Sequence, residues 1–152
     1  TTHNSLEAYT SKGSIVTPTA VAADDIMFSY SHYGYDGSQY KLSSVISASV
    51  DPDATVSSGA VPGQLIIATT PDNGSTLKFV VLDKDGNFGI NVTNPTKKLE
   101  VNGNGQFASE VLLGRMDQTA INALTAANGM IVYNTTTNKF QGYENGAWSN
   151  LI

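Results

Sequence analysis

Residues 64–90 read QLIIATTPDNGSTLKFVVLDKDGNFGI, and this stretch decides the fold. The runs at 64–70 and 77–82 are rich in aliphatic and β-branched residues, and a shorter apolar run follows the second turn. Pro-Asp-Asn-Gly at 71–74 and Asp-Lys-Asp-Gly at 83–86 separate the runs, and Asp-Gly tolerates the positive φ of tight hairpins. The stretch therefore predicts three short strands joined by hairpins.

The residues before this stretch extend the same sheet. From residue 26, Ile, Phe and Tyr alternate with Met, Ser and Ser along IMFSYS, with the period of two that indicates a half-buried strand. Residues 41–50 (KLSSVISASV) favour another strand, with a helix over their first half as the alternative. We therefore expect an antiparallel β-sheet domain over 24–90, after an extended lead-in over 1–23 that contains one short strand at 14–17.

The rest of the chain predicts a smaller module. A linker strand is expected within 91–103, followed by a helix-plus-meander module over 104–152. Asp117 is a plausible N-cap for the helix, and Asn128-Gly129 supplies its stop. Three runs then predict the strands of a meander, at 130–134, 139–143 and 147–151.

The composition excludes several classes of protein. The chain has 8 basic against 13 acidic residues, a formal net charge of −5, and only 14% charged residues, so we expect no nucleic-acid partner. No apolar run approaches the roughly 18 residues that span a bilayer, so no membrane insertion is expected. With no Cys and two His, and without a recognisable catalytic motif, the sequence predicts no metal, no cofactor and no enzyme.

The size of the C-terminal module predicts association. About 50 residues with few apolar side chains form a marginal core on their own. We therefore expect part of a four-residue apolar set to contact another chain or the preceding domain. The set is Val132, Phe140, Tyr143 and Trp148.

Three segments resemble phage tail fibres and related virion fibre proteins. DGNFGINVTNPTKKLEVNG (85–103) is similar to their recurring DGN-x-GIG-T-x-x-P-x-x-KLEV-x-G segment. ALTAANGMIVYNTTTNKFQGYENGAWSNL (123–151) resembles the module that often follows it. SHYGYDGSQYKLSSVI (31–46), followed by PGQLIIATTP (62–71), is similar to an upstream stretch of such fibres. The chain departs from the pattern at Asn91-Val92, where the family has Gly-Thr.

The resemblance implies a mainly β, closely packed or intertwined homotrimer at the distal, C-terminal end of a virion fibre. It implies multivalent, non-enzymatic attachment to a host-cell surface glycan or protein, with other fibre or tail segments as further partners. The alternative is a spacer or trimerisation module without a receptor site of its own. A glycan depolymerase would require a pair of carboxylates in a groove between chains.

A cluster of aromatic side chains is the most suggestive local feature. Tyrosine rings stack on the apolar face of a pyranose, while neighbouring carboxylates and amides bind its hydroxyl groups. The alternative is that alternate residues of this segment pack into the sheet and the others cover turns. The candidate ligand-binding residues are Tyr30, His32, Tyr33, Tyr35, Asp36, Tyr40 and, in the C-terminal module, Trp148.

The sequence Asp83-Lys-Asp-Gly-Asn87 has the opening spacing of a calcium-binding loop. Asn94 stands where the acidic twelfth ligand is required, and the flanking residues predict strands. We therefore interpret it as a hairpin turn.

Overall fold

The computed structural model describes residues 8–14 and 16–151, and over these residues the chain is mainly β. The first seven residues of the predicted lead-in, and Ile15 of the strand predicted at 14–17, lie outside the described residues. Contacts divide the chain into two compact units, Thr1–Gly105 and Gln106–Ile152. No helix of the described chain is long and apolar enough to cross a membrane.

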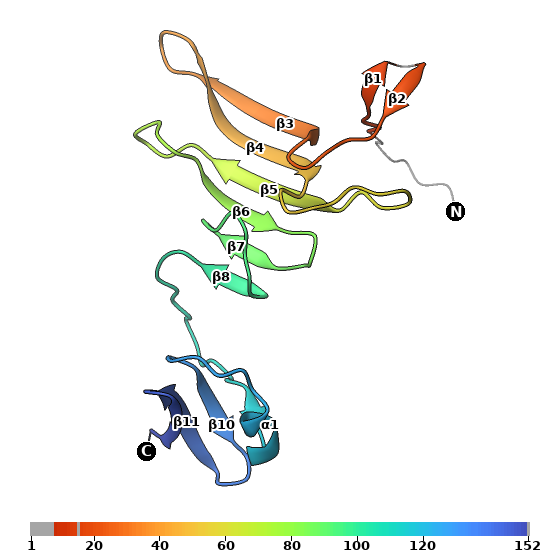
Figure 1. The fold of residues 1–152 in the computed structure, drawn as a ribbon. Helices are drawn as coiled ribbons and strands as arrows, with labels where there is room; N and C mark the ends of the chain where they lie inside the picture. Colours follow the sequence, from red (N-terminus) through yellow and green to blue (C-terminus); the bar gives the residue numbers. More distant parts are fainter. Residues whose placement is uncertain (1–7, 15, 152) are drawn as a thin grey trace, which may run out of the picture. The chain divides into compact units, whose positions relative to one another are not determined.

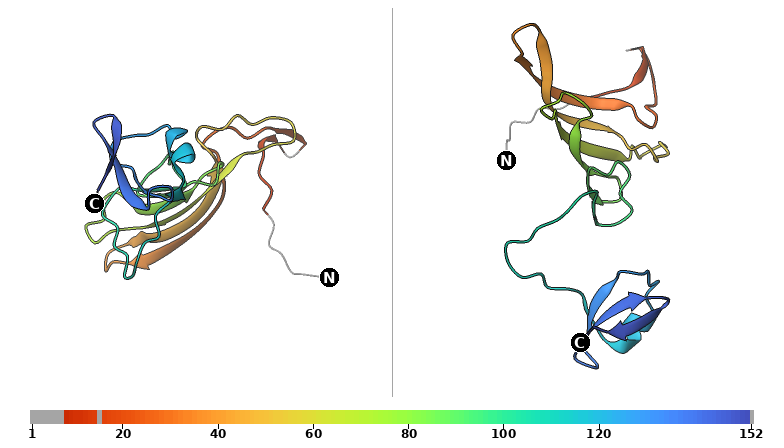
Figure 2. Two further views of the ribbon diagram at one scale, coloured as in Figure 1. Left: turned by 90° about the horizontal axis from the view of Figure 1, so that it is seen from below. Right: turned by 90° about the vertical axis from the view of Figure 1, so that its left-hand side faces the viewer.

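The N-terminal unit is built on one twisted six-stranded sheet in the order β3-β4-β5-β6-β7-β8 (Figures 1 and 2). The first five strands pair antiparallel with their neighbours, and β8 joins β7 in parallel. The predicted strands are confirmed, and the helical alternative for the first half of 41–50 is wrong. The bounds are β3 Ile26–Tyr35, β4 Tyr40–Val50, β5 Gly63–Thr69, β6 Lys78–Leu82, β7 Phe88–Ile90 and β8 Leu99–Val101.

The segment before the sheet contains a small hairpin. Strands β1 (Lys12–Ser14) and β2 (Thr17–Thr19) pair antiparallel, so two short strands lie where the sequence predicts one. The Lys12 ammonium lies 3.0 Å from the Asp25 carboxylate, which also accepts a hydrogen bond from the Ala22 amide. These contacts attach the lead-in to the beginning of β3.

One face of the six-stranded sheet is apolar and exposed. Because successive side chains of a strand point to opposite faces, residues paired in register share a face. The registers define two rows that each cross all six strands, and we call these rows the apolar face. Tyr30, Ile46, Ile67, Val80, Ile90 and Val101 form one row, and Phe28, Ala48, Leu65, Leu82, Phe88 and Leu99 form the other.

The opposite face contains much of the unit's own core. Ala68 and Val81 are buried there, next to a hydrogen bond of 3.1 Å from the Gln64 amide to the Ser49 hydroxyl. The loop between β7 and β8 passes over Gly89, at the centre of β7, and buries it. A single chain therefore covers part of one face of the sheet and leaves the apolar face open.

The C-terminal unit contains the predicted meander. Strands β10 (Ile131–Asn134), β11 (Lys139–Glu144) and β12 (Ala147–Asn150) pair antiparallel in sequence order. An unpredicted two-residue strand, β9 (Arg115–Met116), pairs in parallel with β10. Helix α1 (Gln118–Asn122) begins at the predicted N-cap, Asp117, but ends well before Asn128-Gly129.

The core of this unit is small and partly polar. Ile121 and Val132 are buried, whereas Phe140 stays exposed. Asn134 is also fully buried, and its amide nitrogen donates to the side-chain oxygens of Gln118 (2.8 Å) and Gln141 (3.0 Å). A hydrogen-bonded amide network therefore occupies part of the space that a larger domain fills with apolar side chains.

Candidate functional site

The candidate ligand-binding residues of the N-terminal unit extend from Tyr30, in the middle of β3, through the β3–β4 turn to Tyr40 at the start of β4. Alternating antiparallel connections bring this turn and the β5–β6 loop to the same end of the sheet (Figure 1). All the aromatic side chains of this segment are exposed, the tyrosines by 57–72%. The aromatic segment therefore does not pack into the core of the described chain.

Four of these five aromatic side chains form two pairs. The Tyr30 and His32 rings meet edge-on with centroids 4.6 Å apart, and the centroids of Tyr35 and Tyr40 lie 5.4 Å apart. His32 Nδ1 also lies 3.1 Å from the Ser44 hydroxyl. Tyr30 and His32 share the apolar side of β3, whereas alternation directs Tyr33 and Tyr35 to its other side. The predicted cluster is therefore not one continuous face.

Asp36 shapes the turn between β3 and β4. Its Oδ1 accepts hydrogen bonds from the amides of Ser38 (2.7 Å) and Gln39 (2.8 Å). The bonds from Gln39 and then Ser38 hold the pKa of the Asp36 carboxyl below its usual value of 3.8. Asp36 is therefore an ionised residue that organises the turn and presents the tyrosines on either side of it.

A polar cleft of about 610 Å³ lies between the two loops at this end of the sheet. This cleft was not predicted from the sequence, because the residues at 71–74 indicated only a turn. The order of the predicted strands contains a signal for this cleft. Successive hairpin turns of an antiparallel sheet lie at alternating ends, so the β3–β4 and β5–β6 turns must lie at the same end. The lining residues are Asp36, Lys41, Leu42, Thr70, Asp72, Asn73, Gly74, Ser75 and Leu77.

The lining of this cleft offers carboxylate, amide, hydroxyl and ammonium groups. Asn73 Oδ1 accepts hydrogen bonds from the backbone amide (3.1 Å) and the hydroxyl (2.7 Å) of Ser75, which fixes the β5–β6 loop. Such groups next to tyrosine rings are the chemistry that binds the hydroxyl groups and apolar faces of sugars.

Trp148 belongs to the C-terminal unit. It pairs across strands with Tyr143, and their ring centroids lie 5.2 Å apart in an edge-to-face arrangement. This contact gives Trp148 a packing role within the meander, while its side chain remains half-buried.

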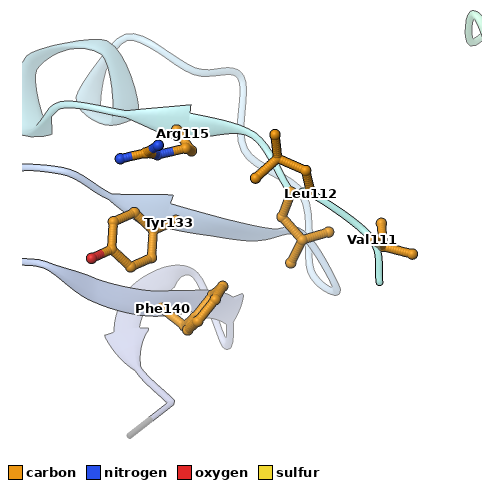
Figure 3. Close-up of a pocket in the computed structure, with 6 residues that line it drawn as sticks. Val111, Leu112, Arg115, Tyr133 and Phe140 are labelled. Atoms are coloured by element: carbon orange, nitrogen blue, oxygen red, sulfur yellow. The ribbon is translucent and has the colours of Figure 1, made fainter. Parts of the chain in front are cut away.

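A second, apolar cavity of about 240 Å³ lies in the C-terminal unit (Figure 3). The Arg115 guanidinium lies 5.6 Å from the centroid of the Tyr133 ring, and this ring meets Phe140 edge-on at 5.2 Å. Val111, Leu112 and Leu113 complete the lining. Aliphatic and aromatic groups dominate this cavity, so it suits an apolar side chain better than a sugar.

The Asp83 loop is a hairpin turn held by its own carboxylate. Asp83 accepts hydrogen bonds from the amides of Asp85 (2.9 Å) and Asn87 (2.8 Å) and from the Asn87 side chain. Asp51 similarly accepts the Lys84 amide at 3.2 Å. Among the described residues, no group of three or more His, Asp or Glu side chains could hold a metal ion. These acceptors stabilise turns.

Replacing Asp83 with Asn is expected to destabilise the chain above pH 5 and to have little effect near pH 2. Burial raises the Asp83 pKa, but the hydrogen bonds from Asn87 and Asp85 outweigh it and hold the pKa below 3.8. A lowered folded-state pKa stabilises the fold above the unfolded-state value, and this stabilisation is lost as the pH falls through the folded-state value. Melting curves of both proteins between pH 2 and pH 7 measure the effect. Parallel pH profiles would contradict it.

The C-terminal part of the chain is similar to a known protein family. Residues 89–152 match the family described as "Phage tail like trimerisation region", less than half of the chain. No curated protein matches. The match indicates a virion-associated, structural tail module that associates with itself, in agreement with the phage tail relationship that the sequence motifs suggest. The matched residues include the meander, the Figure 3 cavity, β8, and the part of β7 from Gly89 onward.

Proposed function

We propose that this chain is an attachment domain of a trimeric phage tail fibre and binds a host-surface glycan or protein at the β3–β4 hairpin. The observation that carries the proposal is the exposure of Tyr33, Tyr35 and Tyr40, whose direct neighbours in the chain or in register, Leu42, Asp36 and Lys41, line the polar cleft. Exposed tyrosine rings supply stacking surfaces, and the cleft supplies partners for hydroxyl groups. The family match supports the trimeric tail context of the proposal.

Three copies of a weak site give firm attachment. Once one site is bound, the others meet the same surface at a high effective concentration, so avidity exceeds the affinity of a single site. Low charge also favours a neutral ligand, because only 14% of the residues are charged. A neutral surface glycan is therefore the preferred ligand of this proposal, and binding requires no catalysis.

The double substitution Tyr33→Ala and Tyr35→Ala is expected to reduce attachment at least about tenfold, because aromatic stacking contributes about 0.5–1.5 kcal/mol per contact and three copies lose it together. The measurement is binding of the labelled full chain to a panel of intact bacterial cells and to immobilised glycans. Tyr33→Phe with Tyr35→Phe is the control, since it keeps both rings, and the melting temperature is compared for all three proteins.

The second candidate is a spacer or trimerisation module of a phage tail, which the family match favours directly. Unchanged attachment by the alanine variant, or no attachment by the unsubstituted chain, would support this candidate and contradict a receptor site at the hairpin. Release of reducing sugar from a bound polysaccharide would contradict the non-enzymatic part of the proposal.

A further inference from the structure

We propose that the apolar face of the N-terminal sheet is an interface with other copies of this chain, so that trimerisation extends upstream of residue 89. The inference rests on the trimeric part of the proposed function and is independent of receptor binding. It assigns a partner to a surface most of which lies outside the family match, since β3 to β6 come before the matched residues.

The extent of the exposed apolar surface supports a stable interface. Nine side chains of the two rows expose 38–57% of their area. Their exposed parts amount to roughly 700 Å², close to the ~800 Å² that each partner contributes to a standard interface and above the ~300–600 Å² of the largest apolar patch on a typical monomer. A shallow hollow of about 300 Å³ at the margin of this face, lined by Ile67, Val80 and Ile90 together with Thr69 and Lys78, offers space for a side chain of a neighbouring copy.

Continuity with the matched region identifies the occupant. Ile90, Leu99 and Val101 belong to the residues that match the trimerisation region, and they complete the apolar rows at the β7–β8 end. A copy that contacts these three side chains meets the same uninterrupted face on β6 and β5. An interface that begins in the matched residues therefore continues across the sheet.

The charge pattern favours an identical partner over an oppositely charged one. Neither row contains a charged side chain, and Lys78 lies at the margin, in register with Thr69. With no charge in the two rows and one ammonium group at the margin, electrostatic complementarity contributes little to the choice of partner, whereas equivalent apolar faces meet readily around a threefold axis.

The proposed interface gives the aromatic side chains of the hairpin two different roles, contact between copies and ligand binding. Tyr30 lies in the first row, so it is expected to be covered by a neighbouring copy. Tyr33 and Tyr35 lie on the other side of β3 and remain exposed in the trimer.

Thiol labelling of single-cysteine variants tests the interface directly, because the chain has no cysteine of its own. Leu65→Cys places a thiol on the apolar face, and Val61→Cys places one in the β4–β5 loop outside it, at residues with 42% and 50% exposure. A maleimide is expected to label Leu65→Cys at least tenfold more slowly than Val61→Cys, in samples whose mass by light scattering is about three times 16.0 kDa. Adding Ile67→Lys is expected to remove the protection.

Each outcome decides a different point. Equal labelling rates in a trimeric sample would overturn the inference and leave a trimeric fibre intact. A monomeric unsubstituted chain would overturn both the inference and the trimeric part of the proposed function. If Ile67→Lys fails to fold, the comparison between the two cysteine variants still decides the question.

Discussion

Asn134→Ala is expected to lower the free energy of unfolding by about 3 kcal/mol, because it removes four hydrogen bonds and leaves the side-chain oxygen of the buried Gln141 without its Asn134 donor. The Asn134 amide nitrogen donates to Gln118 and Gln141. Its oxygen accepts the backbone amides of Thr136 (2.9 Å) and Thr137 (3.2 Å), which closes the β10–β11 turn. Alanine removes all four bonds at a fully buried position.

The fluorescence of Trp148 measures the loss of stability in the C-terminal unit selectively. Trp148 is the only tryptophan of the chain and packs on Tyr143 in the same unit, so its fluorescence follows the unfolding of the meander. Urea titrations at one chain concentration are required, since the stability of an oligomer depends on concentration. Asn128→Ala, at an exposed asparagine, is the control, and its effect is expected to stay within about 0.5 kcal/mol. Equal midpoints for both variants would show that the amide network contributes nothing.

The strands of the sheet could be predicted because their signals are local. Alternation from residue 26 and the turn residues at 71–74 and 83–86 depend only on neighbours in the sequence, and the structure forms strands on both sides of each turn. Asp117 is similarly a local signal, and its carboxylate accepts the Ala120 amide at 2.8 Å.

The parallel pairings could not be predicted, because they join segments that no turn connects. β9 contains two residues, and β8 reaches β7 only after the loop at 91–98. The end of the helix was also predicted wrongly, at Asn128-Gly129 instead of after Asn122. Three apolar residues at helical spacing do not determine where a helix ends, and the Ala123 amide already donates to the carbonyls of the last turn.

Position 91 shows that a departure from a motif can preserve the backbone. Asn91 has φ 53°, in the left-handed region that glycine adopts without strain and that asparagine tolerates best among the other residues. Its side chain also accepts the Phe79 amide at 3.2 Å. Asparagine can therefore replace the family's glycine at this turn.

The candidate site was only partly predictable. The exposure of the tyrosines, the two aromatic pairs (Tyr30 with His32, Tyr35 with Tyr40) and the position of the cleft depend on register, including the shift between His32 and Tyr33. The run Leu65-Ile66-Ile67 is apolar toward both faces of the sheet, a pattern typical of a strand that is covered on both sides. One chain leaves Leu65 and Ile67 exposed, and the inferred trimer interface removes this conflict.

Gly89→Ala is expected to destabilise the N-terminal unit by about 3 kcal/mol, because the added methyl group has no space. A Cβ at this position would lie 2.6 Å from the Val92 backbone oxygen, 3.3 Å from the Val92 Cβ and 3.4 Å from the Pro95 Cβ. The closest atom belongs to the backbone of the loop that covers β7, so relief requires moving that loop off the sheet. Asn91 bonds this loop to β6 through Phe79, which resists the movement.

Gly34→Ala is the matched control, since it lies within β3 and a Cβ there would meet no atom within 4 Å. Thermal melts followed by far-UV circular dichroism are expected to show a lower melting temperature for Gly89→Ala and little change for Gly34→Ala. If the loop instead tolerates the methyl group, both variants will melt together, and the packing of the loop on β7 will not be what requires glycine at position 89. A lowered melting temperature with retained trimer mass would show that this close packing stabilises each chain separately from its association.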